Sequence, residues 1–140
     1  MSRTLGIDFG TRRIGLALSD PTGTLASPLP FLENTGIPEV IAKLEELVQS
    51  HGIKIIVVGL PRNMDGTYGP SAEKVRDFIS QIQPQLSAKI LAQDERLTTA
   101  QASRDLSQIG LNQKELRKKI DSAAASLILQ QFLDRNHLSP

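Results

Sequence analysis

The run Ile53–Leu60 (IKIIVVGL) is the feature that most restricts how this chain can fold. It is short, rich in β-branched residues and apolar at nearly every position. A strand of this composition is typically buried on both faces, as in a parallel sheet that helices cover. The sequence must therefore supply helices to pack against it.

Segments with the apolar spacing of amphipathic helices flank this strand on both sides. The first runs from Ile37, with Pro38 suited to its first turn and Gly52 suited to its end. The second has Ser71 as its expected N-cap and is stopped by Pro84. The apolar residues of this second helix are Ala72, Val75, Phe78, Ile79 and Ile82.

Three strand-like segments come before the first helix. Residues 5–9 and Arg13–Ser19 alternate between apolar and small or polar side chains, as half-buried strands do. Thr24–Leu32 contains Pro28 and Pro30, which cannot donate to a central ladder, so it is expected at a sheet edge. Together the three segments predict an antiparallel meander.

After the second helix, Ala88–Gln93 reads as a further short strand. Thr98 opens a helix predicted to reach Ile109, and Asn112 opens a final helical region with an expected break near Asp121. The apolar residues expected in that region are Leu116, Ile120, Ala123, Ala124, Leu127, Ile128 and Leu133.

The resulting order, β-β-β-α-β-α-β-α, predicts an α/β fold of the ribonuclease H-like architecture. Its sheet would be mixed and five-stranded, a meander followed by parallel strands, with helices on both faces. A length of 140 residues suits one domain, residues 1–140.

The composition of the chain excludes several kinds of chemical site and argues against a membrane or secreted protein. The chain has no cysteine, which excludes disulfides, zinc–thiolate sites and cysteine nucleophiles. It has neither a long apolar span nor a signal sequence, so we expect a cytoplasmic protein with no membrane partner. A net charge of +1 does not by itself indicate nucleic-acid binding.

One acid lies inside the first apolar strand. Asp8 shares a strand face with Gly6, and an acid there is costly to bury unless a cation compensates it. Gly6 and Gly10 leave room for a ligand or for another backbone. A metal ion is one suitable cation; a turn cap, or pairing with Arg12 or Arg13, would explain Asp8 equally well.

Further acids stand at the end of the last strand, Asp94 and Glu95, and in the C-terminal helix, Asp121. Carboxylates without cysteine or a well-placed histidine suit Mg²⁺ or Mn²⁺. Two such ions can activate a water and stabilise the leaving oxygen in phosphodiester hydrolysis. Neighbouring strand residues point to opposite faces, so only one of Asp94 and Glu95 should face the metals. Ordinary surface acids at element ends remain the alternative.

Several basic residues could hold nucleic-acid phosphates, and one aromatic residue could stack on an unpaired base. Arg62 and Tyr68 lie in the loop Gly59–Ser71, which leads from a buried strand to a helix N-terminus. A glycine-rich connection and a solvated helix face are the plainer explanations. The basic candidates are Arg12, Arg13, Arg62, Arg96 and the run Lys114–Lys119, including Lys114 and Lys118.

Four blocks of the sequence together resemble the signature blocks of the YqgF/RuvX family. They are GIDFGTRRIGLALSD (Gly6–Asp20), GLPRNMDGTYGPSA (Gly59–Ala72), DERLTT (Asp94–Thr99) and KKIDSAAASLILQQFL (Lys118–Leu133). The family is described as pre-16S rRNA nucleases and as similar to Holliday-junction resolvases. The resemblance spans nearly the whole chain in the family's order.

The resemblance implies a ribonuclease H-like fold, divalent-metal nuclease activity and a bacterial role in maturing the 5′ end of small-subunit rRNA. Carried over by motif, Asp8, Glu95 and Asp121 would be the metal-binding catalytic acids. It implies pre-rRNA, and with it ribosomal particles, as partners; branched DNA, and a monomer or a homodimer, stay open.

Two other functions remain in competition. Asp8-Phe9-Gly10-Thr11 also looks like the phosphate-binding hairpin of actin- and sugar-kinase-like ATPases, which close two such domains around a nucleotide. A non-catalytic nucleic-acid-binding or ribosome-assembly factor could keep the fold and use its basic face, although the intact acid set argues against it.

Overall fold

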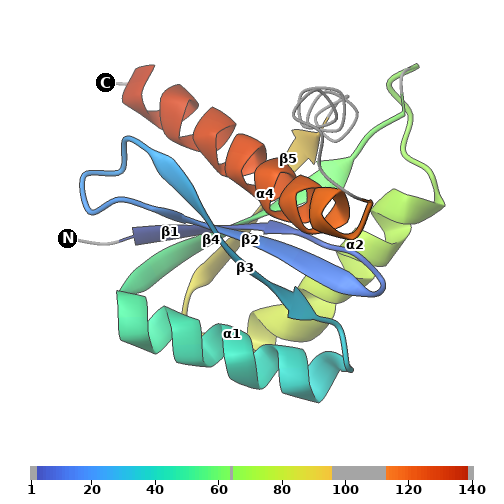
Figure 1. Cartoon of the computed structure of the whole chain (residues 1–140), viewed down its shortest axis with the longest axis horizontal. Helices are drawn as coiled ribbons and strands as arrows, with labels where there is room; N and C mark the ends of the chain where they lie inside the picture. Colours follow the sequence, from blue (N-terminus) through green and yellow to red (C-terminus); the bar gives the residue numbers. More distant parts are fainter. Residues whose placement is uncertain (1–2, 64, 96–112, 139–140) are drawn as a thin grey trace.

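A computed structural model describes residues 3–63, 65–95 and 113–138; for Glu95, residues 113–122 and residues 136–138 it describes the backbone alone. One mixed sheet of five strands runs through the molecule in the order β3-β2-β1-β4-β5. Figure 1 shows α4 crossing one face of this sheet and α1 and α2 covering the other. The predicted α/β architecture is confirmed.

The meander and the parallel strands lie where the sequence predicts them. β1 (Arg3–Asp8) pairs antiparallel with β2 (Arg13–Ser19), which pairs antiparallel with the edge strand β3 (Ala26–Glu33). β4 (Ile53–Pro61) lies parallel between β1 and β5 (Lys89–Glu95). Both prolines of β3 sit at the sheet edge, where a missing donor costs no central ladder bond.

The apolar side chains divide into two layers, one on each face. The larger layer joins Leu5, Ile7 and Ile56 to α1 (Ile37–His51) and α2 (Pro70–Ile82). The smaller layer lies under α4 (Gln113–Leu138) and contains Ala17, Ala125, Leu129 and Leu133. A short 3-10 helix, η1 (Gln83–Gln85), follows α2. No helix within the described ranges is long and apolar enough to cross a membrane.

Two details of the helices differ from the prediction, and one predicted helix is not described. α2 starts at Pro70, so Gly69 is its N-cap and Ser71 lies inside the first turn; Pro70 fixes the first helical position without needing a side-chain cap. α4 continues without a break through Asp121, because Ser122 and the alanines after it are compatible with a helix. The helix predicted to begin at Thr98 lies outside the described residues.

The buried face of α4 also differs from the predicted one. Ala124, Ile128 and Leu133 are buried as expected, whereas Ala123 and Leu127 are only half-buried. Their place in the core is taken by two residues that the prediction omitted, Ala125 and Leu129. Residues 123–129 are apolar at every position except Ser126, so their own spacing did not select a face.

Candidate metal and nucleic-acid site

Asp8 is the last residue of β1 and is half-buried. It pairs with Gly15 of β2, at the end of the sheet where the chain turns from β1 into β2. Side chains alternate along a strand, so Asp8 lies on the same face as Gly6. Gly6 touches α4, which places Asp8 on the α4 face of the sheet.

The glycines on either side of Asp8 make room for the chain's own backbone. A Cβ added to Gly6 would lie 2.8 Å from Cβ of Leu129 and 3.0 Å from the carbonyl oxygen of Ala125. A Cβ added to Gly10 would lie 2.3 Å from the carbonyl oxygen of Arg13. Other parts of the chain therefore approach closely at both glycines, α4 at Gly6 and the start of β2 at Gly10.

The turn after Asp8 is braced by a residue that sequence reasoning missed. The side-chain amide of Asn34 donates to the carbonyl oxygen of Gly10 at 3.1 Å, and its main-chain N–H donates to that of Arg12 at 2.8 Å. Arg12 is exposed in this turn, and the guanidinium of Arg13 lies 5.2 Å from the ring centre of Phe31. Nothing in the sequence around Asn34 signals this role.

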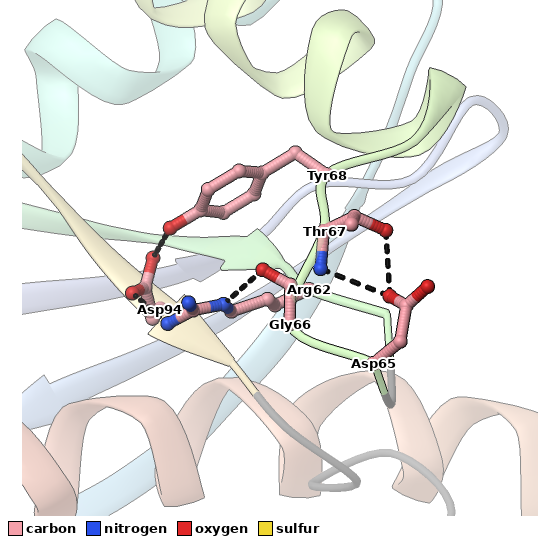
Figure 2. Close-up of polar contacts among 6 residues, drawn as sticks. All are labelled: Arg62, Asp65, Gly66, Thr67, Tyr68 and Asp94. Atoms are coloured by element: carbon pink, nitrogen blue, oxygen red, sulfur yellow. Dashed lines mark hydrogen bonds and ion pairs between the residues drawn. The ribbon is translucent and has the colours of Figure 1, made fainter.

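Asp94 and Glu95 are the last two residues of β5, paired with Leu60 and Pro61 of β4. The hydroxyl of Tyr68 donates to Oδ1 of Asp94 at 2.8 Å, and the Arg62 guanidinium donates to Oδ2 at 3.2 Å (Figure 2). Both oxygens of Asp94 are therefore occupied by the loop that follows β4. The side chain of Glu95 lies outside the described residues.

The loop between β4 and α2 is tightly bonded to itself. Asp65 accepts hydrogen bonds from both the N–H and the hydroxyl of Thr67, which lowers the pKa of the Asp65 carboxyl. Arg62 Nε donates to the carbonyl oxygen of Gly66 at 2.7 Å (Figure 2). With one of its side-chain nitrogens on Gly66 and another on Asp94, the Arg62 guanidinium is held in one orientation.

The ring of Tyr68 lies close to this arginine and to a second one that the sequence did not indicate. Its ring centre lies 5.3 Å from Cζ of Arg62 and 4.8 Å from Cζ of Arg76, within cation–π range of both. The hydrogen bond to Asp94 raises the pKa of the Tyr68 hydroxyl. Tyr68 is 38% exposed, so part of the side chain faces solvent. The spacing of Arg76 on an exposed helix face gave no signal of this contact.

The remaining predicted residues are placed only by their backbone or not at all. Asp121, Lys114 and Lys118 belong to the first half of α4, and their side chains lie outside the described residues. Arg96 lies outside them altogether. Among residues with described side chains, no three potential metal ligands gather; Glu95 and Asp121 are not in that set.

Comparison with known sequences gives matches along nearly the whole chain. The family model named RuvX, described as Holliday junction resolvase, matches residues 2–135. A protein of Moorella thermoacetica named "Putative pre-16S rRNA nuclease" is 44% identical over 133 residues, 95% of each chain. One of the same name from Roseiflexus sp. is 40% identical over 132 residues, 94% of each chain.

Comparison with solved structures agrees on the fold. The structure of T. thermophilus RuvC in complex with a Holliday junction substrate has a TM-score of 0.61 at 13% identity, covering 99% of this chain and 98% of that one. The fowlpox virus resolvase with junction DNA has a TM-score of 0.55 at 12% identity, covering 96% and 98%. At these identities the similarity establishes a shared architecture.

Proposed function

Because the chain belongs to the RuvX family, we propose that it is a divalent-metal-dependent nuclease that hydrolyses phosphodiester bonds in the precursor of 16S rRNA. Relatives named for that reaction are up to 44% identical and match almost end to end. We place the reaction in the bacterial cytoplasm, on pre-rRNA or assembling ribosomal particles. The structural observation that carries the proposal is the position of Asp8 at the end of β1, on the face that α4 covers.

Asp8, Glu95 and Asp121 are the acids we assign to the metal. Asp8 and Glu95 end two parallel-running strands, β1 and β5, that flank β4. Asp121 lies in the helix that crosses β1. The acids thus come from the first strand, the last strand and the last helix, and α4 packs on the sheet face where it contacts Gly6 of β1 and Gln93 of β5.

Strand alternation favours Glu95 over Asp94 as the second acid. The side chain of Gln93 in β5 reaches α4. Position 95 is two residues further along the strand, so alternation assigns it to the same face of the sheet. Asp94 belongs to the opposite face and already accepts hydrogen bonds from Tyr68 and Arg62. A carboxylate held in this way would have to give up both partners to bind an ion.

The donor set fits a hard divalent cation. Three carboxylates offer only oxygen atoms, which suits Mg²⁺ or Mn²⁺. One or two such ions supply the activation of the attacking water and the stabilisation of the leaving oxygen. The contribution of the chain itself is to keep Asp8 beside the backbone contact of Gly6 with α4, so that the carboxylate is positioned before substrate arrives.

The nucleic acid would be held by residues around this end of the sheet. Arg62, fixed by Gly66 and Asp94, is suited to bind a phosphate, and Tyr68 to stack on an unpaired base. Arg12 and Arg13 belong to the turn next to Asp8. The basic residues that we assign to flanking phosphates are Arg12, Arg13, Arg62, Arg96, Lys114 and Lys118.

The test is cleavage of labelled single-stranded RNA, duplex DNA and four-way junction DNA by the purified protein, in Mn²⁺, Mg²⁺ or EDTA. We expect metal-dependent cutting of RNA that Asp8→Asn abolishes while the protein stays folded. Asp77→Asn, the same change on the exposed side of α2, is the matched control and should remain active. A fully active Asp8→Asn protein would contradict the assignment of Asp8.

The same assay separates RNA maturation from a second candidate, resolution of branched DNA. This candidate is favoured by the description of the family model and by the fold shared with junction-bound resolvases. Selective cutting of the junction, together with a homodimer in solution, would support it. Tight binding without any cutting would instead support a non-catalytic assembly factor.

A further inference from the structure

Gln93, in β5, is a buried amide whose two polar atoms have unequal surroundings. The residue is 5% exposed. Its Nε2 donates to the carbonyl oxygen of Ile128 in α4 at 2.8 Å and lies 3.5 Å from Oε1 of Gln131. Its Oε1 is buried and has no hydrogen-bond partner among the described residues. Because the partner at Ile128 is a carbonyl, only the NH₂ group of Gln93 can face it.

This arrangement does not favour stability. A single hydrogen bond contributes less net stability than a buried polar atom without a partner costs. An apolar side chain of the same length would avoid the cost of the buried, unpaired oxygen and would lose only the hydrogen bond to Ile128. The glutamine is therefore better explained by the position it imposes than by the stability it adds.

The position it imposes concerns α4. The turn Ala125–Leu129 of this helix is held to β1 through the close contact with Gly6, and to β5 through the bond from Gln93 to Ile128. Each proposed metal acid is close in sequence to a residue that makes one of these two contacts. Asp8 is two residues beyond Gly6, Glu95 is two beyond Gln93, and Asp121 is one helical turn before Ala125.

We infer that Gln93 is a positioning residue of the metal site, which fixes β5 against α4 and so sets Glu95 relative to Asp121. The inference rests on the proposed function, since it assumes that these acids share an ion. Gln93 does not touch the ion or the substrate in this scheme. Its effect is transmitted through the backbone of the strand and of the helix.

The test is Mn²⁺ binding to the free protein, measured by calorimetry and by the electron paramagnetic resonance of unbound Mn²⁺, without nucleic acid. Gln93→Met keeps the side-chain length but has no N–H donor. We expect its melting temperature in EDTA to equal or exceed that of the wild type. Its Mn²⁺ affinity should fall about tenfold, as it does when residues that orient metal ligands are substituted. Gln81→Met on the exposed face of α2 is the matched control.

Gln93→Asn provides a second variant, because it retains an amide that is one methylene too short to reach Ile128; its Mn²⁺ affinity should fall as well. Wild-type Mn²⁺ affinity in both variants would overturn the inference, and a lowered melting temperature with unchanged affinity would show a purely structural role. Failure of the wild type itself to take up Mn²⁺ would contradict the proposed function, and the inference with it.

Discussion

The loop after β4 is bound to the end of β5 through the carboxylate of Asp94. Asp94 receives the hydroxyl of Tyr68 and the guanidinium of Arg62, so it ties the end of β5 to the loop that starts α2. The next position, residue 95, belongs to the other face of the sheet by strand alternation, and Glu95 is the acid that we propose for the metal. We therefore propose different roles for these two adjacent acids, because neighbouring positions of a strand alternate between the two faces of a sheet.

This arrangement predicts different effects for two substitutions of Tyr68. Tyr68→Phe loses the hydroxyl bond to Asp94 but keeps the ring beside Arg62 and Arg76. Stacking on a base is worth about 1–3 kcal/mol. We therefore expect Tyr68→Phe to keep most of its affinity for single-stranded RNA and Tyr68→Ala to lose it by about tenfold or more. Fluorescence anisotropy in EDTA measures both, and wild-type affinity in Tyr68→Ala would exclude base stacking.

Asp20 gives a pH-dependent prediction. Its carboxylate accepts from the Thr22 hydroxyl and from the N–H groups of Leu25 and Thr24, which lowers its pKa from 3.8 to about 2. A pKa depressed in the folded state contributes stability above the unfolded value, and this is lost as the pH falls through the folded value. Asp20→Asn should therefore melt below the wild type at pH 6.

That difference should shrink between about pH 4 and pH 2, as the wild-type carboxylate takes up its proton. Melting temperatures of the two proteins across this range, followed by circular dichroism, provide the measurement. A gap that stays constant down to pH 2 would mean that the ionised carboxylate of Asp20 does not stabilise the turn between β2 and β3.

At the scale of elements, β1 and α4 make a close contact near the site where they cross. A Cβ at residue 6 would lie 2.8 Å from Cβ of Leu129, so Gly6→Ala forces the helix outward. Overpacking of this kind costs about 1–3 kcal/mol. We expect Gly6→Ala to lower the urea midpoint and to weaken Mn²⁺ binding. An unchanged midpoint would mean that α4 adjusts freely at this crossing.

Most elements were predictable because their patterns are local. The β-branched run of β4, the alternation of β2 and the helical stripe of α1 each specify an element within a few residues. α4 was predicted less well, because its residues 123–129 are almost all apolar and the buried face depends on the sheet below. Its fit against Gly6 is a property of two distant segments.

The candidate site was predictable in residue types but not in contacts. Asp8 stood out as an acid in an apolar strand, and the structure places it on the α4 face. The roles of Asn34, Arg76 and Gln93 depend on partners far along the chain, which no local pattern specifies. The preference that we propose for Glu95 over Asp94 rests on the register of β5 and on the hydrogen bond from Tyr68 to Asp94, neither of which the sequence specifies.

At the scale of the whole molecule, the proposed metal site takes its ligands from both the first strand and the last helix of the chain. Asp8 belongs to the first strand and Asp121 to the last helix, and the sheet order puts β1 at its centre. The acids can converge only after α4 has packed on the sheet. Binding of the ion should therefore be linked to global folding rather than to the ordering of one loop.

This linkage predicts that Mn²⁺ raises the melting temperature of the wild-type protein. An ion at one hundred times its dissociation constant stabilises the folded state by about 2.7 kcal/mol. In a domain of this size that corresponds to a rise on the order of 10 °C, reversed by EDTA. Asp8→Asn and Asp121→Asn should show no rise, while Asp77→Asn should behave as the wild type.

In EDTA, Asp8→Asn should remain cooperatively folded, because Asn has nearly the same shape as Asp and Asp8 is only half-buried. A cooperative melting transition without metal, combined with no response to metal, distinguishes a lost ligand from a damaged fold. A rise with Mn²⁺ that is equal in the wild type and in Asp8→Asn would place the ion elsewhere on the molecule and remove Asp8 from the site.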